Sequence, residues 1–127
     1  MPRRQGRVPP AGGHAMLDSL RRFKAAIFRA LGHPLRVGVV EYLQYGEQTA
    51  DRLAEKLGCD PAALAPHLDA LVRAALVVPR EAGGRTVYAI RDPAFVRVLG
   101  TMREYYFSHL TEAMRLLKQE DDELRKG

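Results

Sequence analysis

The sequence predicts a mainly α-helical domain with a small β-hairpin, arranged as a winged helix-turn-helix. Two short amphipathic helical patterns, the first ending at Gly58 and the second starting at Pro61, are separated only by a short turn, as in a helix-turn-helix. Two β-rich runs then flank Gly83-Gly84, which is typical of a hairpin. Longer helical patterns precede and follow this unit, and 127 residues are enough for one domain and hardly for two.

The first predicted element is a helix that ends near Gly32, because apolar side chains recur at helical spacing from Leu17 onward. The preceding residues, 1–15, hold three prolines, three glycines and three arginines, with no acidic residue and almost nothing to bury. We therefore expect a disordered basic arm over 1–15 and a folded domain over 16–127.

Local start and stop signals delimit three short helices after the first one. Pro34 suits the first turn of a second helix, which runs to Gly46. Thr49 is expected to cap a third helix, with Gly58 just past its C-terminus. Asp60-Pro61 supplies the N-cap and the first residue of a fourth helix.

A hairpin and a long helix complete the predicted order. The runs Leu76–Val78 and Thr86–Ile90 are rich in β-branched residues and lie on either side of Gly83-Gly84, so we expect them to pair as the strands of a wing. Asp92-Pro93 then caps a last helix, whose apolar side chains recur at helical spacing as far as Leu117.

The two terminal helices, about 16–31 and 93–124, carry more apolar surface than one small core can use. Tyr105-Tyr106-Phe107 is a consecutive run, so its side chains point around much of the last helix. Such surplus apolar faces favour a homodimer interface that is built from both helices. The alternative is that the two helices simply cover the core of their own domain.

Composition and charge narrow the classes of function. The hydrophobic content of 46% and the charged content of 28% are those of a globular protein, and no apolar run approaches the roughly 18–20 residues that span a bilayer. The net charge of +5 is concentrated in residues 1–15, which permits nucleic-acid binding through local patches. Glycine-rich phosphate loops, clustered carboxylates and a recognisable Cys/His pair are all absent. We therefore expect a cytoplasmic protein that is not an enzyme.

Four motifs occur in order between about Leu20 and Leu99. They are Ala30-Leu31-Gly32-His33-Pro34-Leu35-Arg36, TADRLAEKLG over 49–58, His67-Leu68 followed by Leu71, Ala74, Leu76 and Val77, and Gly83-Gly84-Arg85-Thr86-Val87-Tyr88-Ala89-Ile90. Together these motifs resemble the ArsR/SmtB family of bacterial transcriptional repressors. The resemblance implies a homodimer that binds an operator and is released when an inducer, such as a metal ion, binds.

The start of the fourth helix departs from the pattern of that family, in which the start of this helix is usually rich in Ser and Thr. Ala62, Ala63 and Ala65 stand there instead, and their methyl groups can touch thymine methyls but cannot hydrogen-bond to bases. Pro66 lies inside the helical pattern and removes an amide donor. Either the helix kinks at Pro66, or a separate turn precedes a helix that restarts near it.

The DNA-binding candidates lie on the two helices of the helix-turn-helix and on the wing. Cations at such places contact phosphates, which contributes affinity but reads few bases. The alternative for each arginine is an ordinary solvated surface side chain. The candidates are Thr49, Arg52, Ala62, Ala63, Pro66, His67, Arg73, Arg80 and Arg85.

The sequence requires no cofactor, and the number of potential ligands does not support a metal effector. His109 and Glu112 lie one helical turn apart on the last helix, so two copies of the chain would supply four ligands. The Asp-x-His pair that the family places upstream is absent. Cys59 is a single thiol and is most simply a small packed residue. An organic effector between the aromatic side chains of the terminal helices is a further alternative to a plain dimer core.

The sequence thus predicts a homodimeric DNA-binding transcriptional regulator, a repressor of the ArsR/SmtB type that an effector releases. Its expected partners are double-stranded DNA and a second copy of the chain, with no membrane. The alternative is a winged-helix protein-interaction module or co-regulator with weak or nonspecific DNA binding. Ala62, Ala63, Ala65 and Pro66 would form a small apolar patch that suits a protein partner equally well.

Overall fold

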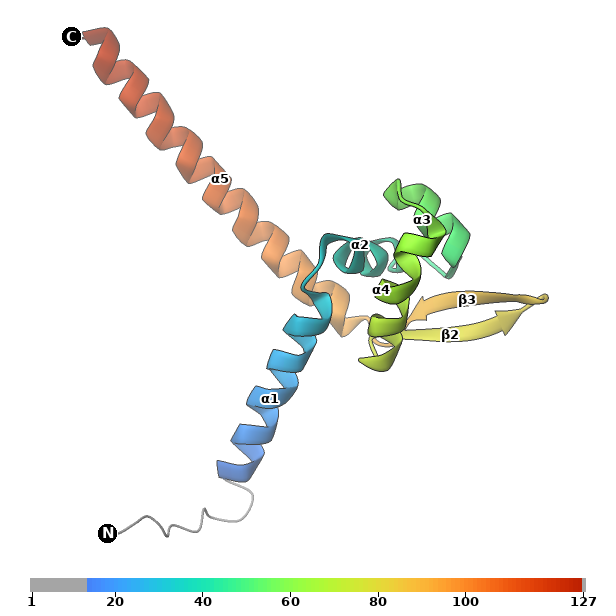
Figure 1. The fold of residues 1–127 in the computed structure, drawn as a ribbon. Helices are drawn as coiled ribbons and strands as arrows, with labels where there is room; N and C mark the ends of the chain where they lie inside the picture. Colours follow the sequence, from blue (N-terminus) through green and yellow to red (C-terminus); the bar gives the residue numbers. More distant parts are fainter. Residues whose placement is uncertain (1–13, 127) are drawn as a thin grey trace, which may run out of the picture. The chain divides into compact units, whose positions relative to one another are not determined.

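The computed structural model describes residues 14–126, which form two compact units that divide between Arg91 and Asp92. The first unit contains four helices and a three-stranded sheet, and the second is a single long helix (Figure 1). Most of the predicted basic arm lies outside the described residues. The elements are α1 (His14–Leu31), α2 (Pro34–Leu43), β1 (Gln48–Thr49), α3 (Ala50–Leu57), α4 (Pro61–Arg73), β2 (Val77–Ala82), β3 (Arg85–Ile90) and α5 (Ala94–Lys126).

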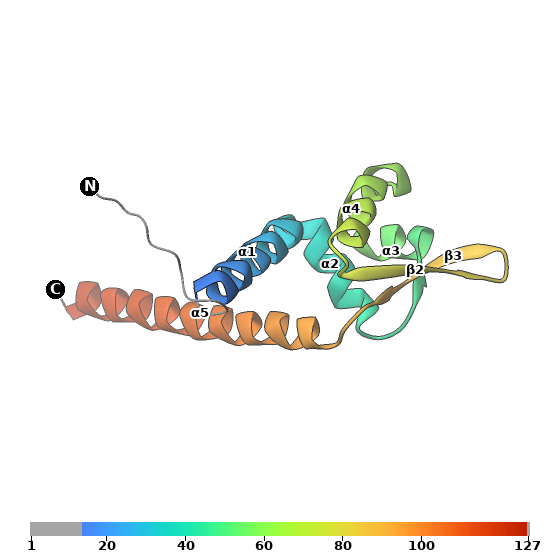
Figure 2. The same ribbon diagram turned by 90° about the horizontal axis from the view of Figure 1, so that it is seen from below.

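The predicted winged helix-turn-helix is confirmed, with one strand more than the sequence analysis expected. The sheet is antiparallel in the order β1-β3-β2, and the short strand β1 pairs Gln48 with Tyr88 on β3. The hairpin strands β2 and β3 extend to a two-residue turn at Gly83-Gly84. Both glycines have positive φ, 58° and 79°, as a type I′ turn requires. The hairpin projects beyond the helices of its unit (Figures 1 and 2).

The core of the first unit lies where α2, α3 and α4 meet each other and the sheet. Most of the apolar positions that recur at helical spacing on these three helices are buried there, whereas Leu35, Leu57 and Val72 are half-buried. α1 contributes one buried side chain, at its C-terminal end. The buried apolar residues are Leu31, Val39, Val40, Leu43, Leu53, Ala54, Leu64, Leu68, Leu71, Leu76 and Val77.

The helix starts follow the predicted capping residues. The Thr49 side chain accepts a hydrogen bond from the Arg52 amide, and the Asp60 carboxylate accepts one from the Ala62 amide. Of the two alternatives left open for Pro66, the separate turn followed by a restarted helix does not occur, since α4 is one helix from Pro61 to Arg73. Pro66 is on the exposed side of α4, where its ring does not have to fit against a neighbouring element.

Helices α3 and α4 end in the same way but with different residues. The Cys59 amide bonds to the Ala54 carbonyl in α3, and the Leu76 amide bonds to the Leu71 carbonyl in α4, which is the hydrogen bond of a Schellman motif. The residue before each amide has a left-handed backbone. In α3 it is Gly58, with φ 70°, and in α4 it is Ala75, with φ 61°.

The second unit, α5, is 33 residues long and buries none of them. It begins at the predicted cap, where the Ala94 amide donates to the Asp92 carboxylate at 2.9 Å. It continues through the acidic run Glu120–Glu123, whose side chains are exposed. No helix in residues 14–126 is long and apolar enough to cross a membrane.

Helices α1 and α5 both carry large apolar side chains on their surfaces, as the excess of apolar positions predicted. Phe23 on α1 is 62% exposed, and Tyr105 on α5 is 75% exposed. The described exposed set on α1 is Met16, Leu17, Leu20, Phe23 and Phe28, and on α5 it is Val98, Met102, Tyr105, Tyr106, Phe107, Leu110, Met114, Leu116, Leu117 and Leu124.

Candidate nucleic-acid interface

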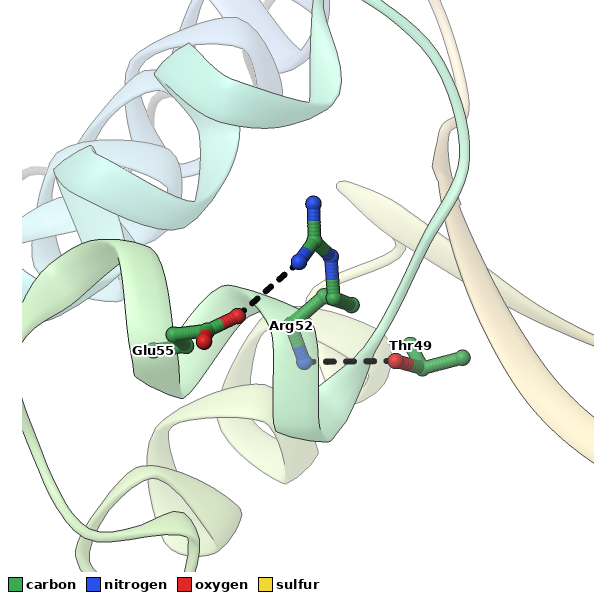
Figure 3. A network of polar contacts seen from close by, with 3 residues as sticks. All are labelled: Thr49, Arg52 and Glu55. Atoms are coloured by element: carbon green, nitrogen blue, oxygen red, sulfur yellow. Dashed lines mark hydrogen bonds and ion pairs between the residues drawn. The ribbon is translucent and has the colours of Figure 1, made fainter.

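Side chains at the start of α3 bond to its first turn and to one another. Thr49 accepts a hydrogen bond from the Arg52 amide at 3.2 Å, and the Arg52 guanidinium pairs with Glu55 at 3.0 Å (Figure 3). The predicted contact residues Thr49 and Arg52 are therefore adjacent. The Thr49 oxygen serves as the helix cap, and the Arg52 charge is shared with a carboxylate one turn along, so a phosphate would compete with Glu55 for this arginine.

Helix α4 presents one exposed face that combines apolar, acidic and basic groups. Ala62, Pro66, Asp69 and Arg73 are all exposed and follow one another at spacings that keep them on one side of a helix. The predicted contact Ala63 is also exposed and lies beside this face. Asp69, an acidic residue that the sequence did not single out as a DNA contact, lies on the same face, and its helical spacing from Ala62 and Pro66 already places it there.

His67 lies outside this exposed face. Its ring is half-buried, and its Nδ1 atom accepts a hydrogen bond from Nε of Arg36 on α2 at 3.1 Å. Burial of the ring lowers the pKa of His67 from its ordinary value, and the positive charges of His33 and Arg36 lower it further. The structure thus separates His67 from Ala62, Pro66 and Arg73, with which the sequence analysis grouped it.

The wing carries two arginines in different environments. Nε of Arg80 donates to Glu47 Oε2 at 2.8 Å, and a second nitrogen of the same guanidinium pairs with the other carboxylate oxygen. These hydrogen bonds hold the pKa of Glu47 below its ordinary value and raise that of Arg80. Arg85 directly follows the Gly83-Gly84 turn and is exposed, and the described part of the chain contains no ion pair that uses it.

Of the two metal ligands predicted on α5, one is already engaged in an ion pair. The Glu112 carboxylate is paired with Arg115, one turn further along, and the hydrogen bond from Arg115 lowers the pKa of Glu112. His109 is exposed on the same helix. Within residues 14–126 there is no group of three or more His, Cys, Asp or Glu side chains that could hold a metal ion. Cys59, in the turn before α4, is half-buried.

Comparison with known proteins points to the same part of the chain. A protein-family model described as a helix-turn-helix domain matches residues 31–80, which run from the end of α1 to the middle of β2. The HTH-type transcriptional regulator Rv2034 of Mycobacterium tuberculosis is 33% identical over 97 residues, which cover 76% of this chain and 90% of that protein.

One further relative is named as a repressor, and one similar solved structure is described as a homodimer. A protein of Streptomyces lividans named "Probable mercury resistance operon repressor" is 32% identical over 69 residues, or 54% of this chain and 55% of that one. The solution structure of Mb0332 from Mycobacterium bovis, a homodimeric winged helix-turn-helix DNA-binding domain and possible ArsR-family regulator, has a TM-score of 0.69 and 25% identity. The matched region covers 80% of this chain and 94% of the Mb0332 chain.

Proposed function

The chain belongs to the ArsR/SmtB family of winged helix-turn-helix transcriptional regulators, and from this membership we propose that it acts as a homodimeric repressor. In this proposal the exposed face of α4 binds in the major groove of operator DNA, and the wing lies along the neighbouring phosphates. The two copies of α4 in a dimer then read two half-sites that are about one helical turn apart.

The observation that carries the proposal is the arrangement of α4 and the wing. The exposed face of α4 starts at Ala62 and ends at Arg73, directly before the hairpin that carries Arg85. An exposed face on the second helix of a helix-turn-helix is suited to the major groove, and the guanidinium groups of Arg73 and Arg85 supply cations for phosphates.

The composition of the α4 face determines what kind of specificity we expect. Ala62 and Ala63 offer methyl groups, which suit thymine, while Asp69 is an acceptor of the kind that pairs with the amino group of cytosine. Since few groups on this face donate hydrogen bonds, we infer that much of the specificity comes from DNA shape and from the spacing of the half-sites.

The dimer in the proposal uses the exposed apolar faces of α1 and α5. Each of the two helices exposes several large apolar side chains, which is typical of an interaction surface, and the homodimeric state of the Mycobacterium bovis neighbour supports a second copy as its partner. The similarity to a protein named as a mercury resistance operon repressor supports the repressor role, and we propose that an effector releases the protein from DNA. The chemistry of the effector stays open, with a metal ion at His109 and Glu112 as one proposal.

Fluorescence anisotropy tests the function directly. The duplex upstream of the chain's own gene is compared with a scrambled duplex of the same length and composition, each at two salt concentrations. We expect the first duplex to bind about 10³-fold more tightly or better. Equal and steeply salt-dependent binding of both duplexes, or no binding, would contradict the proposal and favour the second candidate.

The second candidate is a protein-interaction module, and the exposed patch of Ala62, Ala63, Ala65 and Pro66 favours it. Ala63→Arg separates the two candidates. If a protein partner contacts the patch, its binding is lost, because a long cation replaces a methyl group. If DNA contacts the patch, nonspecific DNA affinity rises, because the new arginine adds one phosphate contact. The change is tolerated by the fold since Ala63 is exposed.

A further inference from the structure

One guanidinium group connects three helices of the first unit. Arg36 is on α2, and its Nε donates to Nδ1 of His67 on α4 at 3.1 Å. Its Nη1 donates to the carbonyl oxygen of Ala30, in the last turn of α1, at 3.2 Å. α1 carries the exposed apolar side chains of the proposed dimer interface, and α4 carries the face proposed to enter DNA, so this guanidinium lies between the two.

A second histidine completes the contact. His33 caps α2, and its Nδ1 accepts a hydrogen bond from the Leu35 amide at 3.0 Å. Its ring lies against that of His67, with the ring centroids 4.1 Å apart and the planes tilted by 33°. We call the group formed by Arg36, His67, His33 and the Ala30 carbonyl the α2 junction.

The α2 junction depends on the protonation state of His67. Nδ1 of His67 accepts a hydrogen bond, so it carries no proton in this arrangement. An imidazolium has a proton on both nitrogens and cannot accept. Proton uptake at Nδ1 therefore breaks the bond to Arg36 and places two cations side by side.

The surroundings of the ring favour its neutral form. Burial, His33 and Arg36 all lower the pKa of His67 from 6.5. Those two residues, one capping α2 and one on it, are the ionisable groups whose charges lower the pKa of His67. Among the other elements that pack against α4, α1 meets this group through the Ala30 carbonyl.

We propose that His67 is a positioning residue, which fixes the DNA-binding helix α4 to the end of α1 through Arg36, and that proton uptake by its ring releases α4. This inference rests on the proposed function, because its consequence is a change in DNA binding. A ligand or subunit contact that moves α1 would reach α4 through the same hydrogen bonds.

The positioning role and the phosphate contact expected from the sequence predict opposite pH effects. A histidine that touches a phosphate gains affinity for DNA as it becomes charged, and the salt dependence becomes steeper. A histidine that holds α4 in place through a neutral acceptor loses affinity when it is charged. The sign of the pH dependence therefore distinguishes the two roles.

The test measures binding of the full chain to the upstream and scrambled duplexes between about pH 7.5 and 5.5. We expect the affinity of the wild type for the upstream duplex to fall by about tenfold over this range. His67→Asn keeps an acceptor oxygen near the position of Nδ1 but does not titrate, so its affinity stays nearly constant. His14→Asn, at the exposed start of α1, is the matched control and follows the wild type. A wild-type affinity that is constant or rises with acid, or a fall that His67→Asn retains, would overturn the proposal.

NMR of the DNA-free protein provides a second readout. Long-range ¹H–¹⁵N spectra should show an unprotonated Nδ1 on His67 at neutral pH, and the amides at the end of α1 and along α4 should shift together as His67 titrates. Arg36→Gln should remove the shared shift. Independent shifts of the two helices would overturn the proposal even if DNA binding is pH-dependent. If the wild type binds neither duplex, the proposed function fails, and the spectra still decide the role of His67.

Discussion

Glu47 and Arg80 tie the segment that leads into β1 to the first strand of the wing. The two side chains come from positions 33 residues apart, and the guanidinium bonds to both carboxylate oxygens. Both side chains are more than a third exposed, so the pair contributes little to the stability of the fold. Its main effect is on Arg80 itself, because a phosphate has to compete with Glu47 for the same donors.

Removing the carboxylate should therefore strengthen DNA binding. Glu47→Gln leaves a neutral side chain at this position and makes the charge of Arg80 available to a phosphate. We expect tighter binding of both the upstream and the scrambled duplex, with a salt slope that becomes steeper by about 0.9 for the one added phosphate contact. Anisotropy titrations at three or more salt concentrations measure both quantities.

The matched control is Glu41→Gln, which removes an exposed acidic charge on α2. It changes the net charge by the same amount without affecting Arg80, so its salt slope should equal that of the wild type. Equal slopes for Glu41→Gln and Glu47→Gln would contradict the competition between Glu47 and DNA. The pair itself persists until the pH falls through the lowered pKa of Glu47, below 4.5, so its effect is constant near neutral pH.

Arg85 should act without such competition. Arg85→Ala removes an exposed cation beside the turn of the wing, and we expect both duplexes to lose affinity by similar factors, with a salt slope that is shallower by about 0.9. Arg85→Lys keeps the charge and should retain most of the affinity. A loss confined to the upstream duplex would instead assign Arg85 to a base, and an unchanged affinity would remove the wing from the DNA interface.

The sequence predicted the elements whose signals are local. The capping side chains of Thr49 and Asp60 act within three residues, and the hairpin turn at Gly83-Gly84, whose type the sequence left open, needs only its own two glycines. Each of these features is fixed by neighbours along the chain, which is why a linear pattern reveals it.

The features that the sequence did not predict depend on distant residues. β1 is two residues long, too short to show any alternation, and exists because Gln48 pairs with Tyr88. Arg36 and His67 are 31 residues apart, and neither the helical period nor a capping rule relates them. His67 was predicted to contact DNA from its place on α4, and the hydrogen bond that its ring accepts from Arg36 depends on the packing of α2 against α4.

The proposed homodimer predicts that one substitution on α5 will separate the copies. Leu110→Glu places a carboxylate on the exposed apolar surface of α5. An unpaired charge buried in an interface costs about 3–5 kcal/mol, so the dimer dissociation constant should rise more than about a hundredfold. Sedimentation equilibrium over a range of concentrations measures it. Lys118→Glu, which adds a carboxylate at a polar position of the same helix, should leave the dimer intact, and a monomeric wild type would rule out the interface.

The left-handed residue at the end of α4 offers a test of the fold. Ala75 has φ 61°, a conformation that strains a residue bearing a Cβ atom. Ala75→Gly should therefore stabilise the protein by about 1 kcal/mol, since the folded state loses this strain. Urea denaturation should show a higher midpoint at an unchanged slope.

The neighbouring helix provides the reverse experiment. Gly58 ends α3 with φ 70°, and a Cβ atom added there would meet no other atom within 4 Å, so Gly58→Ala introduces backbone strain and no clash. It should destabilise the protein by about 1 kcal/mol. Ala74→Gly is the control for chain entropy: Ala74 has φ −83°, which suits any residue, so glycine there should destabilise by about 0.5–1 kcal/mol. Destabilisation by Ala75→Gly as well would mean that chain entropy outweighs the left-handed strain at the end of α4.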